Sequence, residues 1–431
     1  MHTLLQGDCI EVMRTMQENS VDSLVTDPPA GISFMGKDWD DNKGGRDKWI
    51  AWLTEVMQEA YRVMKPGAHG LVWALPRTSH WTATALENAG FEIRDRVAHI
   101  FGNGFPKSFN VGKQNPEWEG WGTALKPAME DWWLIRKPIS EKTVAANILK
   151  WGTGAINIDD CRVEISNKDN SGHWTQKREL PFGGGGNTGK DFKQEHHSSG
   201  RFPTHVIHDG SDEVTSLFPQ SEVSGSAKNG KPATGEYHKD HHLFSELGRW
   251  QGQLHNDTGT AARFFYCAKA SSADREEGLE NSELHEAEGF DAETAGGYNV
   301  RTWIDRKDGK GKVPVNAKRN PRANHHPTVK STELMRYLCR LITPPNGIIL
   351  DCFLGSGSTG KGAIIEGFQF IGIEKDKEYI AIAEKRITAK YLPLFQEPPR
   401  QPTQREPDKR DSAASQASFT PDFLSDLEGL S

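Results

Sequence analysis

Hydrophobic residues in the first 150 positions alternate between short apolar runs and stretches with helical spacing. Three runs bounded by polar or turn residues are typical of buried strands: 23–25, 70–75 and 96–101. Apolar residues recur at helical spacing over 49–64, and we expect Lys65-Pro66-Gly67 to end that helix. Residues 78–89 can form a second helix. Strands that alternate with helices predict a parallel sheet with helical crossovers.

The same regularity returns near the carboxyl end of the chain. From Thr328 the pattern predicts a helix, a strand, a helix, a strand and a helix: 334–342, 348–351, 358–366, 369–374 and 377–389. Between residues 150 and 325, Gly, Asn, Ser, His and charged residues dominate, and only 204–207 and 261–267 are firmer pieces. We therefore expect a loop-rich insertion between two regular parts. Beyond Leu392 the chain is rich in Pro, Gln and Ser, which is typical of a disordered tail.

Composition narrows the class of protein. The 431 residues are 35% hydrophobic and 26% charged, and no apolar run approaches the roughly 20 residues that a bilayer span needs. The amino terminus lacks the basic and apolar regions of a signal peptide, so we expect a cytoplasmic protein that does not enter a membrane. Five scattered cysteines without a CxxC pair argue against a zinc ribbon or disulfide framework, and we predict no metal site.

Charge is unevenly distributed. The net charge is −7, yet residues 301–330 hold nine Lys or Arg residues against two Asp residues. A run of like charge is more often a solvated face than a binding site. Beside the motifs described below, the stretch becomes a candidate for contacts with nucleic-acid phosphates.

A glycine turn lies in the carboxyl-terminal part. Gly355-Ser356-Gly357 follows the predicted strand 348–351 and precedes a helix, an order that brings backbone amides and a helix amino terminus near a ligand. Glu374 ends the next strand, at close to the spacing of roughly 20 residues expected of nucleotide-binding units. Such a carboxylate can accept hydrogen bonds from both ribose hydroxyls. The sequence therefore predicts a nucleoside site here.

Two segments partly match a phosphate-binding P-loop. Residues 355–361 fit GxxxxGK, but Gly362 stands where Ser or Thr would hold magnesium. Residues 184–190 also fit GxxxxGK, but Asp191 stands at the Ser or Thr position, and no convincing strand precedes the segment. Both segments lack the Ser or Thr that would bind magnesium, so an NTPase is a weak alternative.

The amino-terminal motif is Thr26-Asp27-Pro28-Pro29, which follows the predicted strand 23–25. An exocyclic amine of a base is a poor nucleophile because its lone pair is delocalised into the ring. The Asp27 carboxylate and the Pro28 carbonyl, held rigid by two consecutive prolines, could accept hydrogen bonds from both N–H groups of such an amine. An ordinary Asp-Pro turn explains the tetrapeptide equally well.

Taken together, these motifs resemble the amino-methyltransferases that modify DNA at adenine N6 or cytosine N4, in the circularly permuted β-type order. In that family the DPP[YFW] motif comes first, a target-recognition region follows, and the cofactor motifs come last. The resemblance covers roughly residues 1–165 and 324–392, and phage and prophage members look most similar. Segments 26–37, 121–128 and 150–159 carry this likeness.

The resemblance implies a role for each matching residue. Asp27 and Pro28, followed by Pro29, would hold the target amine. The S-adenosylmethionine site would be formed by Asp8, Asp351, Phe353, Gly355, Ser356, Gly357 and Glu374, with Glu374 on the ribose and Asp8 near the adenine. His326, Thr328 and Lys330 resemble the segment that closes over the methionine end of the cofactor.

The chain departs from the family pattern at the fourth motif position. Ala30 stands where an aromatic residue usually stacks on the flipped base, so we expect Phe34 or Trp39 to provide that stacking. Cys352 stands where proline is common. The absence of a Pro-Cys dipeptide disfavours the covalent chemistry of cytosine-C5 enzymes.

The resemblance implies a Rossmann-like, S-adenosylmethionine-dependent methyltransferase with a mixed α/β sheet. Its parts would be a catalytic half (1–165), a target-recognition region (166–323), a cofactor-binding half (324–392) and a disordered tail (393–431). We expect site-specific methylation of adenine N6 in double-stranded DNA, and the resemblance also allows a homodimer. The alternatives are an N4-cytosine enzyme, an RNA or protein-glutamine methyltransferase, and a non-catalytic DNA-binding protein.

Overall fold

The computed structural model describes residues 1–33, 38–102, 104, 108–164, 200–221, 259–269, 274–285 and 322–389. It also describes four strands of three residues that form two antiparallel pairs: β6 (Trp174–Gln176) with β7 (Phe192–Gln194), and β12 (Trp303–Asp305) with β13 (Lys312–Pro314). The predicted tail beyond Leu392 lies outside the described residues. None of the helices in these ranges has the length and apolar character needed to cross a membrane.

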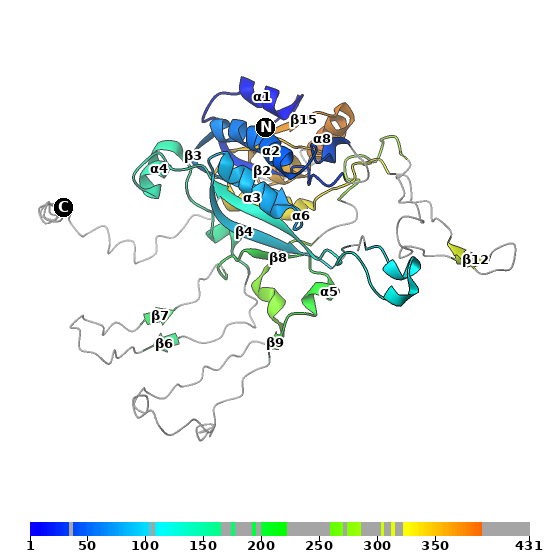
Figure 1. Ribbon diagram of the computed structural model, residues 1–431. Helices are drawn as coiled ribbons and strands as arrows, with labels where there is room; N and C mark the ends of the chain where they lie inside the picture. The colour runs from blue at the N-terminus through cyan, green and yellow to red at the C-terminus, as the bar shows by residue number, and fades with distance from the viewer. Residues whose placement is uncertain are drawn as a thin grey trace, which may run out of the picture. The chain divides into compact units, whose positions relative to one another are not determined.

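Nine strands form one mixed sheet, in the spatial order β1-β15-β14-β2-β3-β5-β4-β8-β11 (Figure 1). Their bounds are β1 (His2–Gln6), β2 (Val21–Thr26), β3 (Met64–Ala74), β4 (Glu92–Ile100), β5 (Met129–Arg136), β8 (Val206–His208), β11 (Tyr266–Cys267), β14 (Ile348–Asp351) and β15 (Gln369–Glu374). Every neighbouring pair is parallel except the two made by β5. The expectation of a mixed α/β sheet is confirmed.

Strands from the two ends of the chain lie side by side. β1 pairs with β15 from His2–Phe370 to Gln6–Glu374, and β14 pairs with β2. Buried polar contacts connect the same elements: the Thr26 hydroxyl donates to Asp351 at 2.7 Å, and Asp22 accepts from the Ile348 amide at 2.8 Å. The first and last parts of the chain therefore build one sheet, whose parallel strands end at a common carboxyl edge.

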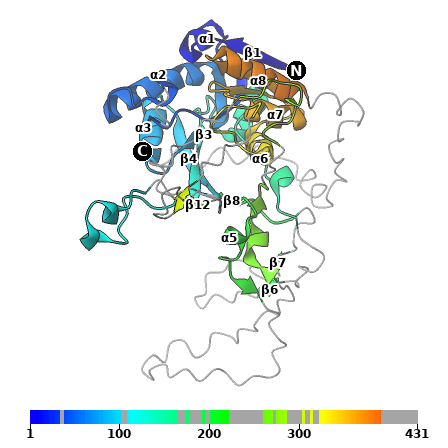
Figure 2. The same ribbon diagram turned by 90° about the vertical axis from the view of Figure 1, so that its right-hand side faces the viewer.

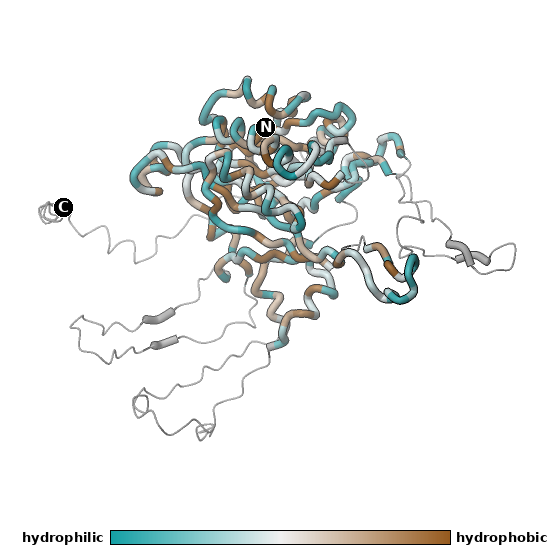
Figure 3. The backbone as a smooth tube through the Cα atoms, viewed as in Figure 1, coloured by the Kyte–Doolittle hydropathy of each residue, from teal (hydrophilic) through white to brown (hydrophobic). Residues whose placement is uncertain are grey.

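Helices cover both faces of the sheet. The larger ones are α1 (Cys9–Thr15), α2 (Arg46–Val63), α3 (Ser79–Asn88), α4 (Val144–Trp151), α6 (Thr332–Ile342), α7 (Ser358–Ile365) and α8 (Lys377–Thr388). In Figure 2, α2 and α3 lie on one side of the sheet and α6 and α7 on the other. The apolar stripe of α2 (Trp49, Leu53, Val56, Met57, Ala60) is fully buried in the core, where hydrophobic segments concentrate (Figure 3).

Two predicted strand starts were wrong. The helix α2 ends at Val63, just before Lys65-Pro66-Gly67 as expected, but this tripeptide already belongs to β3, which begins at Met64 and not at residue 70. The residue before a proline avoids helical geometry, and the Pro66 carbonyl accepts hydrogen bonds from Asn147 and Thr153, which hold this stretch in place. The strand expected at 96–101 begins at Glu92, because charged residues of β4 conceal its first half from a hydrophobicity pattern.

Part of the middle region joins the main sheet, which the sequence did not predict. β8 pairs with β4 and β11 pairs with β8, so the sheet continues beyond the amino-terminal part. Shorter elements of this region are α5 (Asp212–Thr215), η7 (Ala261–Phe264) and the pair β9 (Gln220–Ser221) with β10 (Gly259–Thr260). The circular permutation and the division into domains stay predictions.

Candidate active site

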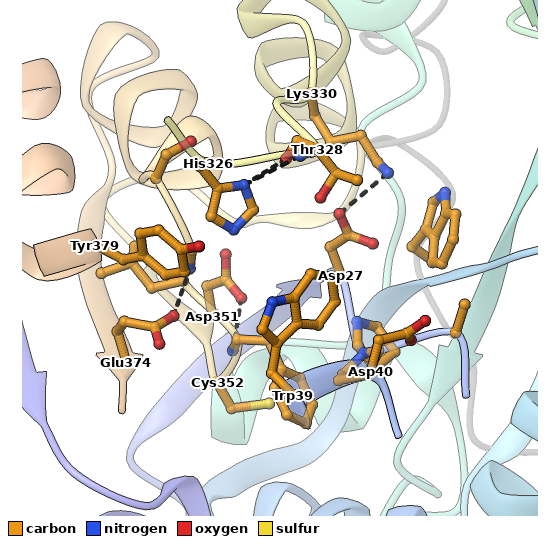
Figure 4. A pocket seen from close by; sticks show the side chains of 18 of the residues that line it. Asp27, Trp39, Asp40, His326, Thr328, Lys330, Asp351, Cys352, Glu374 and Tyr379 are labelled. Carbon is orange, nitrogen blue, oxygen red and sulfur yellow. Dashed lines mark hydrogen bonds and ion pairs between the residues drawn. The ribbon is translucent and has the colours of Figure 1, made fainter. Parts of the chain in front are cut away.

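A cavity of about 1080 Å³ lies at the carboxyl edge of the sheet. Its walls come from both ends of the chain: Asp27 to Ala30 follow β2, and Cys352 to Ser356 follow β14. In Figure 4, Glu374 and Tyr379 lie on one side of Asp351, while Asp27 and Lys330 lie on the other. The structure thus brings both predicted motifs to one hollow.

The glycine turn and the acidic residue contact each other directly. The Gly355 amide donates to Glu374 Oε2 at 2.8 Å, and the Asp376 amide donates to Oε1 at 2.9 Å. Burial raises the pKa of Glu374 above its usual value, against the lowering effect of these amides. Backbone amides thus fix both oxygens of a carboxylate that lines the cavity.

Gly355 and Gly357 serve different purposes. Both have left-handed backbone geometry, with φ of +52° and +80°. A Cβ at Gly355 would lie 2.9 Å from His326 Nε2, on the cavity wall, whereas a Cβ at Gly357 would lie 2.8 Å from the Ala383 Cβ in α8. Gly357 therefore permits helix packing and, unlike Gly355 and Ser356, does not line the cavity.

Aromatic rings border the same side of the cavity. His326 and Tyr379 meet edge to face with centroids 4.6 Å apart, and Trp39 stacks over His326 at 6.4 Å. His326 Nδ1 lies 2.9 Å from the Thr328 carbonyl oxygen, and burial lowers the pKa of this histidine to about 4. His326 is therefore neutral at pH 7. Phe353, which also lines the cavity, packs against Trp52 at 5.9 Å.

Asp8 and Asp351 are occupied by structural hydrogen bonds. Asp8 caps α1 by accepting from the Ile10 amide at 3.0 Å. Asp351 accepts from the Thr26 hydroxyl and from the Phe353 amide, and burial raises the pKa of Asp351 to about 6. Both residues line the cavity, so each can also contact a ligand there.

Lys330 lies on the opposite side, against the amino-terminal motif. Its ammonium is 3.0 Å from Asp27 Oδ2, and the two side chains are only 14% and 22% exposed. Burial raises the pKa of Asp27, and Lys330 lowers it only in part, so the pKa of this carboxyl stays above its usual value. The sequence placed Lys330 at the cofactor and in a basic stretch facing phosphate. The structure buries it against Asp27.

Three residues around Lys330 were missed by the sequence analysis. Glu130 lies 3.4 Å from the ammonium, and the Trp73 ring centroid lies 4.1 Å from it. The Trp73 indole N–H donates to Glu130 at 2.6 Å, and His99 Nδ1 is 3.1 Å from the other Glu130 oxygen. Burial raises the pKa of Glu130, but Lys330 and His99 outweigh this effect and hold it at about 2.

The loop after the Asp-Pro-Pro motif is held by Asp40, which the sequence analysis also missed. The fully buried Asp40 accepts hydrogen bonds from the Gly31 amide at 2.8 Å and the Ile32 amide at 3.3 Å. The Thr78 hydroxyl donates to the Ala30 carbonyl at 3.0 Å. These contacts set the backbone path that leads away from Pro28 and Pro29. Phe34 lies outside the described residues, while Trp39 lines the cavity.

Two alternative chemistries find no support in the described residues. Lys361, the lysine of the P-loop-like match, is fully buried in ion pairs with Asp274 and with Glu277 at 2.7 Å, so it does not reach the cavity. Burial raises the pKa of the Cys352 thiol far above its usual value, which makes it a poor nucleophile. Within the described ranges, no group of three His, Cys, Asp or Glu residues could hold a metal ion.

Known proteins with similar sequences match short stretches of the chain. Type II methyltransferase M2.LlaDCHI of Lactococcus lactis subsp. cremoris is 38% identical over 95 residues, which are 21% of this chain and 35% of that protein. DNA adenine methyltransferase YhdJ of Escherichia coli (strain K12) is 39% identical over 83 residues, 18% of this chain and 28% of that protein. The chain thus spans about a third of the length of these curated relatives.

Matches to solved structures cover more of the chain, at a lower sequence identity. The match to the cytosine-N4-specific PvuII DNA methyltransferase covers 92% of this chain and 93% of that protein's chain, at 12% sequence identity and a TM-score of 0.44. The M1.HpyAVI–SAM complex covers 90% and 100% at 15% identity and a TM-score of 0.36. A broader match comes from the N6/N4 methyltransferase family, described as DNA methylase, which matches residues 21–385. Because that match spans most of the chain, this protein belongs to the N6/N4 DNA methylase family.

Proposed function

We propose that this protein transfers a methyl group from S-adenosylmethionine to the N6 amine of adenine in duplex DNA, at a specific sequence. The observation that carries the proposal is the shared cavity: Asp27 and Pro28 face it from one side, and Gly355 and Glu374 from the other. A target base buried in the duplex would have to flip out to reach these residues.

S-adenosylmethionine is the methyl donor of this family, and the cavity residues fit it. Gly355 keeps open a space that a Cβ would fill, directly beside His326. Glu374 offers oriented carboxylate oxygens for the ribose hydroxyls, and Asp8 lies at the same end for the adenine. Asp351, Phe353, Ser356 and the His326–Thr328 segment complete this proposed binding surface. When bound, the sulfonium supplies an electrophilic methyl group.

The other side of the cavity is proposed to grip the target amine. Asp27 would accept one N–H and the Pro28 carbonyl the other, which pulls the nitrogen toward tetrahedral geometry and frees its lone pair. Pro29 keeps the carbonyl direction fixed. Asp27 has to be ionised for this task, and the Lys330 ammonium favours that form. As the nitrogen gains the methyl group it loses one proton, for which Asp27 is the nearest candidate acceptor.

Adenine N6 is favoured over cytosine N4 because Asp opens the motif, whereas Ser is commoner in N4-cytosine enzymes of this family. The named relatives include a DNA adenine methyltransferase and a cytosine-N4-specific enzyme. An N4-cytosine activity is therefore the alternative. The partner proposed here is double-stranded DNA, with a homodimer as a further expectation.

The test combines modified-base sequencing with an Asp27→Ala variant. DNA from cells expressing the wild-type chain is expected to carry N6-methyladenine at one sequence, while the variant methylates nothing yet binds S-adenosylmethionine with unchanged affinity. N4-methylcytosine would establish the alternative. Methylation by Asp27→Ala at the wild-type rate would overturn the assigned role, and absence of any modified base with the wild type would favour a DNA-binding protein without activity.

A further inference from the structure

A lobe projects from the sheet between β4 and β5. It comprises residues 108–128 and contains two 3₁₀ helices, η3 (Val111–Lys113) and η4 (Pro116–Trp118) (Figure 1, cyan). Four large apolar side chains in it are exposed: Phe109 by 45%, Trp118 by 45%, Trp121 by 61% and Leu125 by 93%. Exposed apolar residues that are grouped in this way mark interaction sites.

Hydrogen bonds fix the shape of the lobe. The Val111 amide donates to the Trp121 carbonyl at 2.9 Å, and the Trp121 amide donates to the Trp118 carbonyl at 3.0 Å. The two indole rings meet edge to face with centroids 5.0 Å apart. The Ser108 hydroxyl accepts from the Thr123 amide at 2.9 Å. The aromatic residues are thus presented on a preorganised scaffold, which lowers the entropic cost of inserting them into a partner.

The lobe lies beside the cavity that holds the Asp-Pro-Pro motif. β4 ends and β5 begins at the carboxyl edge of the sheet, and the lobe leaves from that edge. Ala124, Leu125 and Pro127 line the cavity together with Asp27 and Glu130. Of the four exposed apolar residues, Leu125 lines the cavity itself, so the lobe borders the wall that also holds Asp27 and Glu130.

The lobe has balanced charges, which favours contacts with DNA bases over contacts with phosphates. Between residues 108 and 126, Lys113 and Lys126 are balanced by Glu117 and Glu119. Lys126 is also engaged, because its ammonium donates to the Gly102 carbonyl at 2.6 Å. A neutral, aromatic surface gains little from the DNA backbone, but it can fill an apolar gap between stacked bases.

We propose that the lobe is a wedge, in which Trp121 and Leu125 enter the base stack of duplex DNA beside the target and occupy the space that the flipped base vacates. The inference rests on the proposed DNA methylation. Apolar side chains that enter between base steps partly unstack and kink a duplex, and unstacking at the target lowers the cost of flipping.

The first experiment compares two duplexes that carry the sequence found by modified-base sequencing, one with the target base paired and one with an abasic site opposite it. On the paired duplex, Trp121→Ala/Leu125→Ala should slow single-turnover methylation about tenfold or more. On the abasic duplex, whose target is already unpaired, the rate should stay within about twofold of wild type. Trp121→Phe should keep most of the activity, because phenylalanine retains an apolar ring.

The matched control is Leu149→Ala. Leu149 is 90% exposed in α4 and does not line the cavity, so its loss should leave both rates unchanged. An equal loss on both duplexes, or no loss on either, would overturn the wedge. A wild-type protein that methylates neither duplex would instead contradict the proposed function.

A second experiment needs neither catalysis nor a known sequence. Wild-type protein is bound to relaxed closed-circular plasmid, topoisomerase is added, and the linking number is measured after deproteinisation. We expect the wild type to lower the linking number and the double variant at matched occupancy to leave it unchanged. An unchanged linking number with the wild type would contradict insertion. Sedimentation that shows the double variant only dissociating a dimer would make the lobe a contact between copies and overturn the proposal.

Discussion

The Lys330 ammonium lies 3.0 Å from the Asp27 carboxylate, at the point where the proposed reaction needs an acceptor for the target amine (Figure 4). A second carboxylate, Glu130, lies 3.4 Å from the same ammonium. Two buried carboxylates therefore share one cation. This arrangement allows Lys330 to move toward Glu130 when an amine reaches Asp27, without any change in the net charge of the site.

Replacing Lys330 by Met should shift the pH dependence of methylation. Burial and the nearby Glu130 raise the pKa of Asp27, and Lys330 is its main opposing influence. Without the ammonium this pKa rises further, so a larger fraction of Asp27 is protonated at any given pH. The acid limb of the pH–rate profile should move to higher pH, with a greater loss of rate at pH 6 than at pH 8. Lys330→Arg, which keeps the charge, should leave the limb near its wild-type position. An unmoved limb in Lys330→Met would exclude Lys330 as the counterion.

Gly355→Ala should weaken binding of S-adenosylmethionine. A Cβ at this position would lie 2.9 Å from His326 Nε2 and would push that ring or the turn into the cavity. We expect a roughly 5- to 100-fold increase in Kd, measured by calorimetry. Gly367→Ala is the control: this glycine also has a left-handed φ, of +85°, but a Cβ there meets nothing within 4 Å. Equal effects of the two substitutions on Kd would mean that backbone strain, and not the clash, is responsible.

Asp40→Asn should lower the methylation rate and leave cofactor affinity unchanged. An amide cannot accept from both the Gly31 and Ile32 amides as the carboxylate does, so the backbone after Pro28 and Pro29 loses part of its support. Misplaced reacting groups typically cost roughly 10- to 100-fold in rate. The neighbouring Asp41→Asn, which changes an exposed residue, should have little effect. A drop in cofactor affinity with an unaffected single-turnover rate would contradict this role for Asp40.

Lys361→Met should destabilise the fold, although Lys361 takes no part in ATP hydrolysis. The buried ammonium pairs with Asp274 and Glu277, and removing one member of a buried ion pair typically costs about 3–5 kcal/mol. Chemical denaturation should detect this loss, and Lys361→Met/Asp274→Asn should recover part of it. No ATP hydrolysis is expected from the wild type or the variants. Hydrolysis that disappears in Lys361→Met would revive the NTPase alternative.

The order of strands and helices at the two ends of the chain could be predicted from the sequence because hydrophobic period and turn residues are local signals. β15 runs from Gln369 to Glu374 as expected, and β14 runs from Ile348 to Asp351. The start of β3 at Met64 was missed because Asn147 and Thr153, some 80 residues away, hold the Pro66 carbonyl in place. The sequence singled out 204–207, where β8 lies, but a strand of three residues carries too little pattern to show that it pairs with β4 in the main sheet.

By itself the sequence determined which short motifs this chain carries and which family they resemble, because Asp27-Pro28-Pro29 and Gly355-Ser356-Gly357 are contiguous. The tertiary structure decided which side chains surround them. Lys330, Glu130, Trp73 and Asp40 converge on the Asp27 side of the cavity from four separate segments, and Lys361 turns away from it into a buried ion pair. Such partnerships depend on strand order and on burial at the carboxyl edge of the sheet, and no local spacing in the chain encodes them.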